Sequence, residues 1–152
     1  MAMPQANSLP TSKSWRYRPY DFTQTTLAAG ETRVIIDLRK SGWILVGGVF
    51  CNNPLLRWIF ELEDPTQTYR YDMSLFELNT YGGNQACNSW WISVYNIILG
   101  LYAVQFSPAQ WMPFYSRFKF SLNNPTAAPI VVFRTSVLAV EILDTKDKSE
   151  PA

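Results

Sequence analysis

Leu101-Tyr-Ala-Val-Gln-Phe106 and Tyr115-Ser-Arg-Phe-Lys-Phe-Ser-Leu122 are the two stretches that decide the fold of this 152-residue chain. The second stretch alternates between an apolar and a polar set: Phe118, Phe120 and Leu122 against Arg117, Lys119 and Ser121. Because successive side chains of a strand point to opposite faces, this pattern predicts a strand with one buried face and one solvent face. The segment 107–113 between the stretches contains two prolines, which cannot donate to a ladder, so it is predicted to be a connection.

Similar strand-like stretches recur along the chain and are separated by turns rich in Gly, Asn and Pro. They are residues 20–26, 32–38, 43–50, 55–62, 68–73, 89–95 and 130–143. Residues 43–50 are mostly apolar on both faces, which predicts a central strand, and Gly47-Gly48 predicts a bulge or a close backbone approach. Residues 74–78 fit either one helical turn or an edge strand. In 89–95 the inward face is either Trp91, Ser93 and Tyr95 or Trp90, Ile92 and Val94.

About eight or nine short strands with no long amphipathic helix between them predict an all-β fold, an antiparallel two-sheet sandwich or barrel. The number of strands favours a jelly-roll-like sandwich. An immunoglobulin-like sandwich is the alternative, but the cysteine spacing does not match its usual pair with a Trp between. Residues 1–19 are predicted to form an extended N-terminal arm, 20–143 the β-sandwich domain, and 144–152 a short polar C-terminal tail.

The predicted arm interleaves basic and aromatic residues, namely Lys13, Trp15, Arg16, Tyr17 and Arg18. This pattern fits an interface with another subunit or with a polyanion, whereas a frayed terminus is the plainer interpretation. The first residues lack the charged and apolar regions of a signal peptide, so none is expected.

Charged residues make up only 16% of the chain, against about 25% in typical domains. A large part of the surface is therefore uncharged, which suits a protein whose faces are covered by neighbouring subunits. The net charge of +1 provides no overall attraction for nucleic acid. No apolar run approaches the roughly 18 residues that cross a bilayer, so no membrane span is expected.

Catalytic and metal-binding patterns are weak in this sequence. The chain has no histidine, which removes the commonest general base and the commonest transition-metal ligand. Cys51 and Cys87 are more simply two free thiols than one bridge, and two cysteines cannot close a zinc site. We therefore expect no enzymatic activity, no cofactor and no metal. A hydrolase based on carboxylates is the disfavoured alternative to a solvated strand end, and its candidates are Glu61, Glu63, Asp64, Asp72 and Glu77.

The aromatic residues are more informative, because six tryptophans exceed what one small core holds. Trp90, Trp91 and Trp111, with Asn84 and Gln85 nearby, are candidates for a protein interface or for a surface that stacks against sugars. Packing in the core and under loops accounts for about half of the tryptophans. Arg117 and Lys119 are predicted to form a basic outer face that could meet acidic groups of a neighbour, although a solvated face is the simpler explanation.

Taken together, the polar N-terminal arm, the histidine-free β domain and the closing strand after Asn123-Asn-Pro125 resemble a class of small virion structural proteins. This class comprises single jelly-roll capsid, decoration and spike-base proteins of bacterial and archaeal viruses. The resemblance implies a virion protein, made in the host cytoplasm, that forms homo-oligomers and contacts other virion subunits by symmetric contacts. Because spike and tail domains of this architecture often bind sugars, a glycan receptor is the alternative partner. Nucleic acid is not expected.

Overall fold

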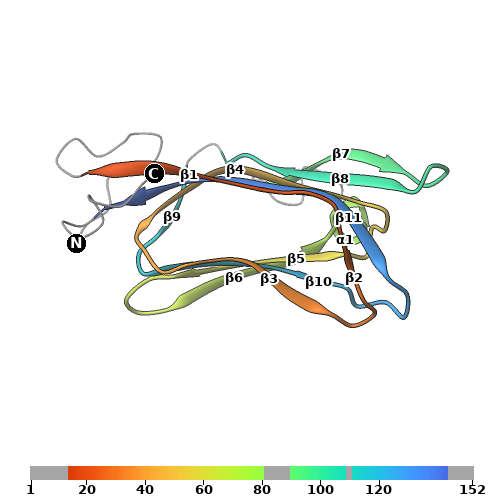
Figure 1. Cartoon of the computed structure of the whole chain (residues 1–152), viewed down its shortest axis with the longest axis horizontal. Coiled ribbons are helices and arrows are strands. Elements are labelled where there is room, and N and C mark those ends of the chain that lie inside the picture. The colour runs from red at the N-terminus through yellow and green to blue at the C-terminus, as the bar shows by residue number, and fades with distance from the viewer. Residues whose placement is uncertain (1–13, 81–89, 109–110, 144–152) are drawn as a thin grey trace.

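Two antiparallel sheets face each other across a layer of apolar side chains (Figure 1). The computed structural model describes residues 14–80, 90–108 and 111–143. The larger sheet, sheet A, has the strand order β1 (Trp15–Phe22), β11 (Ile130–Ile142), β4 (Gly42–Cys51), β8 (Leu101–Phe106) and β7 (Trp90–Asn96), with β2 (Thr25–Leu27) beside β11 and β9 (Met112–Phe114) beside β4. Sheet B has the order β3 (Thr32–Leu38), β10 (Arg117–Asn123), β5 (Arg57–Glu63) and β6 (Thr68–Ser74). A short helix, α1 (Leu75–Thr80), follows β6.

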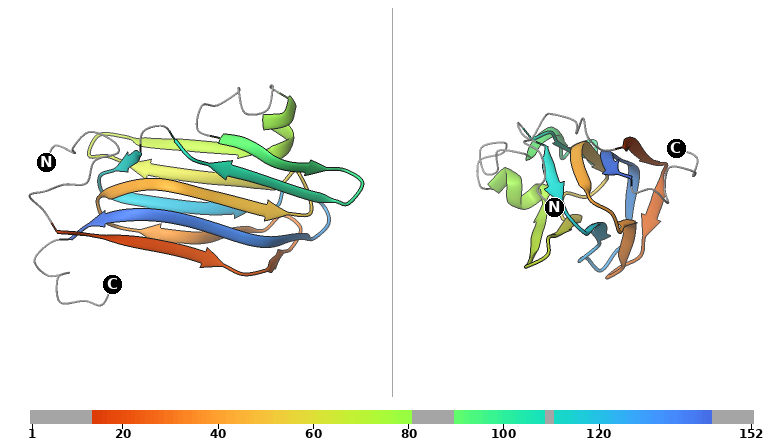
Figure 2. Two further views of the ribbon diagram at one scale, coloured as in Figure 1. Left: turned by 90° about the horizontal axis from the view of Figure 1, so that it is seen from above. Right: turned by 90° about the vertical axis from the view of Figure 1, so that its left-hand side faces the viewer.

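The two C-terminal strands each enter the middle of a sheet. β11 lies between β1 and β4, as Figure 2 shows from above, and β10 lies between β3 and β5. The four-strand orders β1-β11-β4-β8 and β3-β10-β5-β6 are those of a jelly roll, in which the chain passes repeatedly from one sheet to the other. The predicted all-β sandwich of jelly-roll type is confirmed. The described residues contain eleven strands, more than expected, because β2 and β9 are short and β1 comes from the predicted arm.

The predicted boundary between arm and domain at residue 20 is wrong. β1 begins at Trp15 and pairs with β11 along its whole length, from Trp15 opposite Ile142 to Phe22 opposite Thr135. Pro19 is tolerated inside β1 because β1 is an edge strand, where a missing N–H need not break a ladder. Lys13 and residues 144–152 lie outside the described residues, so the predictions for them stay predictions.

The core lies where the inward faces of the two sheets meet. The alternation predicted for β5 is confirmed, since Trp58, Phe60 and Leu62 are at most 3% exposed. The apolar set of β10 is buried in the same way. In β7 a register shift between Ile92 and Val94 breaks the alternation, so neither of the two predicted faces is inward throughout. Trp90 and Ile92 pack against the core before the shift and Tyr95 after it.

Glycines in β4 allow neighbouring backbones to come close, as the sequence predicts. A Cβ built on Gly47 would lie 3.0 Å from the carbonyl oxygen of Ser136, and one on Gly48 would lie 3.1 Å from that of Val104. At Gly42 a Cβ would lie only 1.9 Å from the carbonyl oxygen of Val140 in β11.

Gly42→Ala is therefore expected to lower the free energy of unfolding by about 2–3 kcal/mol, because backbone atoms rather than a flexible side chain must move. Urea denaturation followed by circular dichroism measures the change. Gly48→Ala is the matched control in the same strand, and its smaller overlap predicts a smaller loss. Equal stability of the Gly42 variant and the wild type would contradict the close approach.

Candidate interaction surface

The two sheets differ sharply in charge. The strands of sheet B hold nine charged side chains: Arg33, Asp37, Arg57, Glu61, Glu63, Arg70, Asp72, Arg117 and Lys119. The longer strands of sheet A hold five: Arg16, Arg18, Asp21, Arg134 and Glu141. The outer face of sheet B is therefore a solvated ionic surface, whereas that of sheet A needs a different explanation.

Acidic and basic side chains alternate across sheet B and neutralise each other. Arg57 donates from Nε to Asp72 at 2.7 Å and also bonds to Glu77 at the start of α1. Arg70 donates to Glu61 at 2.9 Å and to Asp72 at 3.2 Å. The carboxylates that a hydrolase would need are thus engaged in ion pairs, which favours the solvated strand end over catalysis.

Arg117 and Lys119 do not form a surplus of positive charge. Arg117 makes a two-pronged pair with Asp37, at 2.8 and 2.9 Å. Lys119 lies opposite Asp37 in one neighbouring strand and opposite Glu61 in the other. The hydrogen bond from Arg117 holds the pKa of the Asp37 carboxyl below its ordinary value. The predicted basic outer face is therefore a face of mixed charge, because strands distant in sequence supply the acids.

Arg16 and Arg18 of the predicted arm belong to an ionic cluster within this chain. Arg16 lies directly opposite Glu141 and donates from Nε to its Oε1, and Arg18 Nη1 lies 3.8 Å from the same oxygen. Glu141 is fully buried, and its Oε2 has no hydrogen-bond partner in the structure. Because Arg16 and Arg18 pair with Glu141 inside the fold, the structure favours an internal role for them over the predicted interface role. Glu141 is the only acidic residue in the predicted closing strand 130–143, and it is the feature of the sequence that could have indicated this cluster.

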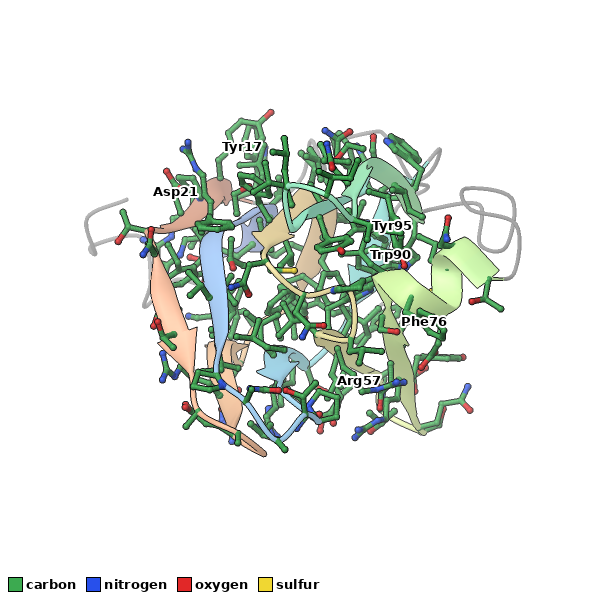
Figure 3. The ribbon with its side chains drawn as sticks, turned by 90° about the vertical axis from the view of Figure 1, so that its right-hand side faces the viewer. Tyr17, Asp21, Arg57, Phe76, Trp90 and Tyr95 are labelled. Carbon is green, nitrogen blue, oxygen red and sulfur yellow. The ribbon has the colours of Figure 1, made fainter. Side chains whose placement is uncertain are left out.

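Trp15 and Tyr17, which alternate with Arg16 and Arg18 in β1, point outward. Trp15 packs against an apolar group that we call the outer aromatic cluster. It comprises Trp43, Leu45 and Val140, all buried, with Trp15, Trp111, Leu138 and Ile142 packed against them. Tyr17 lies edge-to-face with Trp15, at 5.3 Å between ring centroids, and stays 47% exposed. Figure 3 shows Tyr17 and Arg57 on opposite sides of the sandwich. The outer face of sheet A therefore carries an aromatic cluster that is largely buried within this chain, with Tyr17 exposed beside it, where sheet B carries charge.

Charge on the outer face of sheet A is limited, among its described residues, to the ion pair between Asp21 and Arg134, which bond at 2.7 and 2.9 Å. This pair lowers the pKa of Asp21. Beside this pair lies a shallow depression of about 170 Å³, whose lining includes Gly48, Ala103 and Ser136 together with Phe50 and Arg134.

The tryptophans predicted to bind a partner have separate locations. Trp90 is 2% exposed and packs against Trp58, Phe60 and Phe106, so it is a core residue and cannot stack on a ligand. Trp91 is half-buried and donates from Nε1 to the side chain of Gln105 at 3.0 Å. Trp111 belongs to the outer aromatic cluster. Asn84 and Gln85 lie outside the described residues.

The chain matches no protein-family model, and no curated protein is significantly similar to it in sequence. The function must therefore be argued from the surfaces themselves.

Reactive groups add little within the described part of the chain. Cys51 is a free and buried thiol whose pKa burial raises to about 11, so it is protonated and unreactive at neutral pH. Cys87 lies outside the described residues. Residues 14–80, 90–108 and 111–143 contain no group of three His, Cys, Asp or Glu placed to hold a metal ion. Within the same residues, no helix has the length and apolar character to cross a membrane.

A further feature escaped the sequence analysis. No charged residue occurs between Glu77 and Arg117, and the β7–β8 hairpin lies in this uncharged stretch. Its turn exposes three aliphatic side chains, with Ile97 at 76%, Ile98 at 94% and Leu99 at 67%. An apolar run usually predicts burial, so sequence alone gave no reason to place these residues in water.

Proposed function

We propose that this protein is a non-enzymatic structural subunit that self-associates through the outer face of sheet A, as a capsid, decoration or spike- or tail-associated component of a virion. The observation that carries the proposal is the difference in charge between the two outer faces. Charge depletion and aromatic enrichment are the compositional marks of a buried interface centre. A lone domain in water would be expected to carry charge on both faces.

The fold adds weaker support. Jelly rolls occur in viral capsid proteins and also in lectins, so the architecture is compatible with the proposal without selecting it. The carbohydrate-binding alternative has lost one of its three candidate tryptophans, because Trp90 is in the core. It now depends on Trp91, on Trp111 and on Asn84 and Gln85, which lie outside the described residues.

A pair of matched valines tests the proposal. Val46 in sheet A and Val34 in sheet B are 44% and 49% exposed, and each lies in a strand. Val46→Asp places a charge on the proposed interface and is expected to weaken self-association at least tenfold, because the charge would be buried without a partner. Sedimentation velocity across a concentration series measures the dissociation constant.

Val34→Asp is the control and is expected to leave association unchanged, because it adds one more charge to a face that is already ionic. Circular dichroism of both variants establishes that they fold. Association that is equally weakened by both substitutions, or by neither, would contradict an interface on sheet A.

A further inference from the structure

The turn of the β7–β8 hairpin is a preorganised apolar projection. Asn96 accepts a hydrogen bond from the backbone N–H of Leu99 at 2.9 Å through its side chain, and Gly100 takes a left-handed backbone conformation with φ 64°. These two residues fix the turn that carries Ile97, Ile98 and Leu99. A rigid projection loses little conformational entropy on binding, which is the general advantage of preorganisation.

A pocket of about 310 Å³ lies between β5, β6 and β9. Its lining is mainly apolar or aromatic and includes Leu62, Tyr69, Tyr71, Met112, Pro113 and Tyr115. Tyr69 and Tyr71 lie opposite Leu62 and Phe60 in the ladder and so belong to the inward face of sheet B. They nevertheless remain 47% and 36% exposed, which shows that the sandwich is open at this point.

The two acidic residues at the pocket are already occupied. Asp64 accepts hydrogen bonds from the backbone N–H groups of Thr66 and Gln67, and Glu63 lies 3.7 Å from Arg117. The pocket therefore favours an uncharged, apolar occupant over a cation. An apolar cavity of about 150 Å³ is large enough for a benzene molecule, so a pocket of this size has room for a branched aliphatic side chain.

The projection and the pocket lie at opposite ends of the molecule. Figures 1 and 2 show the β7–β8 turn at one end of the long axis, and β9 with the turn between β5 and β6 at the other. One copy therefore has both surfaces available at once and cannot bring its own projection to its own pocket.

We propose that the β7–β8 turn of one copy inserts Ile98 into the β5–β6–β9 pocket of a second copy. This contact deepens the proposed function, on which it rests, by naming a second and head-to-tail mode of self-association. Such a heterologous contact repeats from copy to copy and produces a closed ring or an open filament, depending on the rotation between copies.

A lipid surface is the competing occupant for an exposed apolar turn, and the charge pattern argues against it. Surfaces that lie on membranes combine apolar residues with Lys and Arg, which attract anionic headgroups. The hairpin lies in the stretch without charge between Glu77 and Arg117. A partner with an apolar pocket suits it better.

Complementary variants of the full chain test the contact. Ile98→Asp disables the projection, and Tyr69→Arg covers the pocket with a long charged side chain. Both positions are exposed, so both variants are expected to fold. All measurements are made in the Val46→Asp background, which removes the contact through sheet A. Phe76→Asp is the matched control, because Phe76 is also 50% exposed and lies outside both surfaces.

Sedimentation velocity is expected to show at least tenfold weaker association for Ile98→Asp and for Tyr69→Arg. Phe76→Asp is expected to leave the association unchanged. An equimolar mixture of the two variants retains one intact projection and one intact pocket, so it is expected to form a heterodimer and nothing larger. No heterodimer in the mixture, or association unaffected by Ile98→Asp, would overturn the head-to-tail contact while leaving the sheet A interface standing.

Two other results separate the remaining possibilities. A wild-type chain that stays monomeric at its highest soluble concentration would overturn both this contact and the proposed function. Cosedimentation with phosphatidylcholine vesicles that is lost in Ile98→Asp would assign the projection to lipid and overturn its docking on a second copy.

Discussion

Phe60→Ala is expected to lower the free energy of unfolding by about 3–5 kcal/mol, among the largest losses for any single substitution in this chain. Phe60 is 1% exposed, and its ring meets four others. Trp90 and Phe106 of sheet A lie 5.0 and 5.4 Å away between centroids, and Phe118 and Phe120 of sheet B lie 5.3 and 4.7 Å away. Removing the ring deletes contacts to both sheets and leaves a cavity that neighbouring rings cannot fill.

Urea denaturation followed by tryptophan fluorescence measures this loss. Phe60→Leu retains most of the side-chain volume and is expected to cost less than half as much. Phe76→Ala, at a position that is 50% exposed, is expected to change stability by no more than about 0.5 kcal/mol. A loss below about 1 kcal/mol for Phe60→Ala would mean that the core does not depend on this ring.

Glu141→Ala is expected to cost a similar amount, about 3–5 kcal/mol, for an electrostatic reason. The substitution removes the carboxylate to which the guanidinium of Arg16, only 10% exposed, donates. Arg18 also loses the charge 3.8 Å from its Nη1. Removing one member of a buried ion pair costs more than the pair itself contributes, because the remaining charge loses a contact that offset its desolvation.

A compensated double variant distinguishes this explanation from simple loss of packing. Arg16→Met with Glu141→Leu replaces both members of the pair by apolar groups, and it is expected to be markedly more stable than Glu141→Ala. Both are measured by urea denaturation at neutral pH. A double variant as unstable as the single one would show that the charge pair is not the cause.

The fold class could be predicted because alternation is a local property. In β10, and in β5 apart from Ile59, the apolar residues point inward, so the period of two was sufficient to assign the faces. β7 was ambiguous because its register shifts at Ser93, and such a shift depends on the neighbouring strand β8. The sequence of one strand does not contain that information.

β1 was missed although its alternation is regular. Its aromatic residues Trp15 and Tyr17 point outward, and its charged residues Arg16 and Arg18 point inward toward Glu141. The usual assignment of apolar residues to the inside therefore gives the inverse of the observed arrangement. Correct assignment would have required knowing that an acid 125 positions away in the sequence lies opposite Arg16.

The candidate surfaces were predicted only in part. A charge-poor chain correctly indicated an extensive uncharged surface, but its location on sheet A depended on which strands come together. Arg117 and Lys119 do not make a basic face, because Asp37 and Glu61 of the neighbouring strands lie beside them. The turn at Ile98 was overlooked because hydrophobicity alone does not separate a buried segment from an exposed one.

The placement of β10 and β11 also has a consequence for biosynthesis. Each of these strands completes the middle of a sheet, yet they are made after the strands that they join. While the ribosome is still producing the last third of the chain, β1 and β4 have no partner between them, and β3 and β5 are separated in the same way. Neither sheet can close before translation is almost complete, so the nascent chain must keep its apolar strands from aggregating until then.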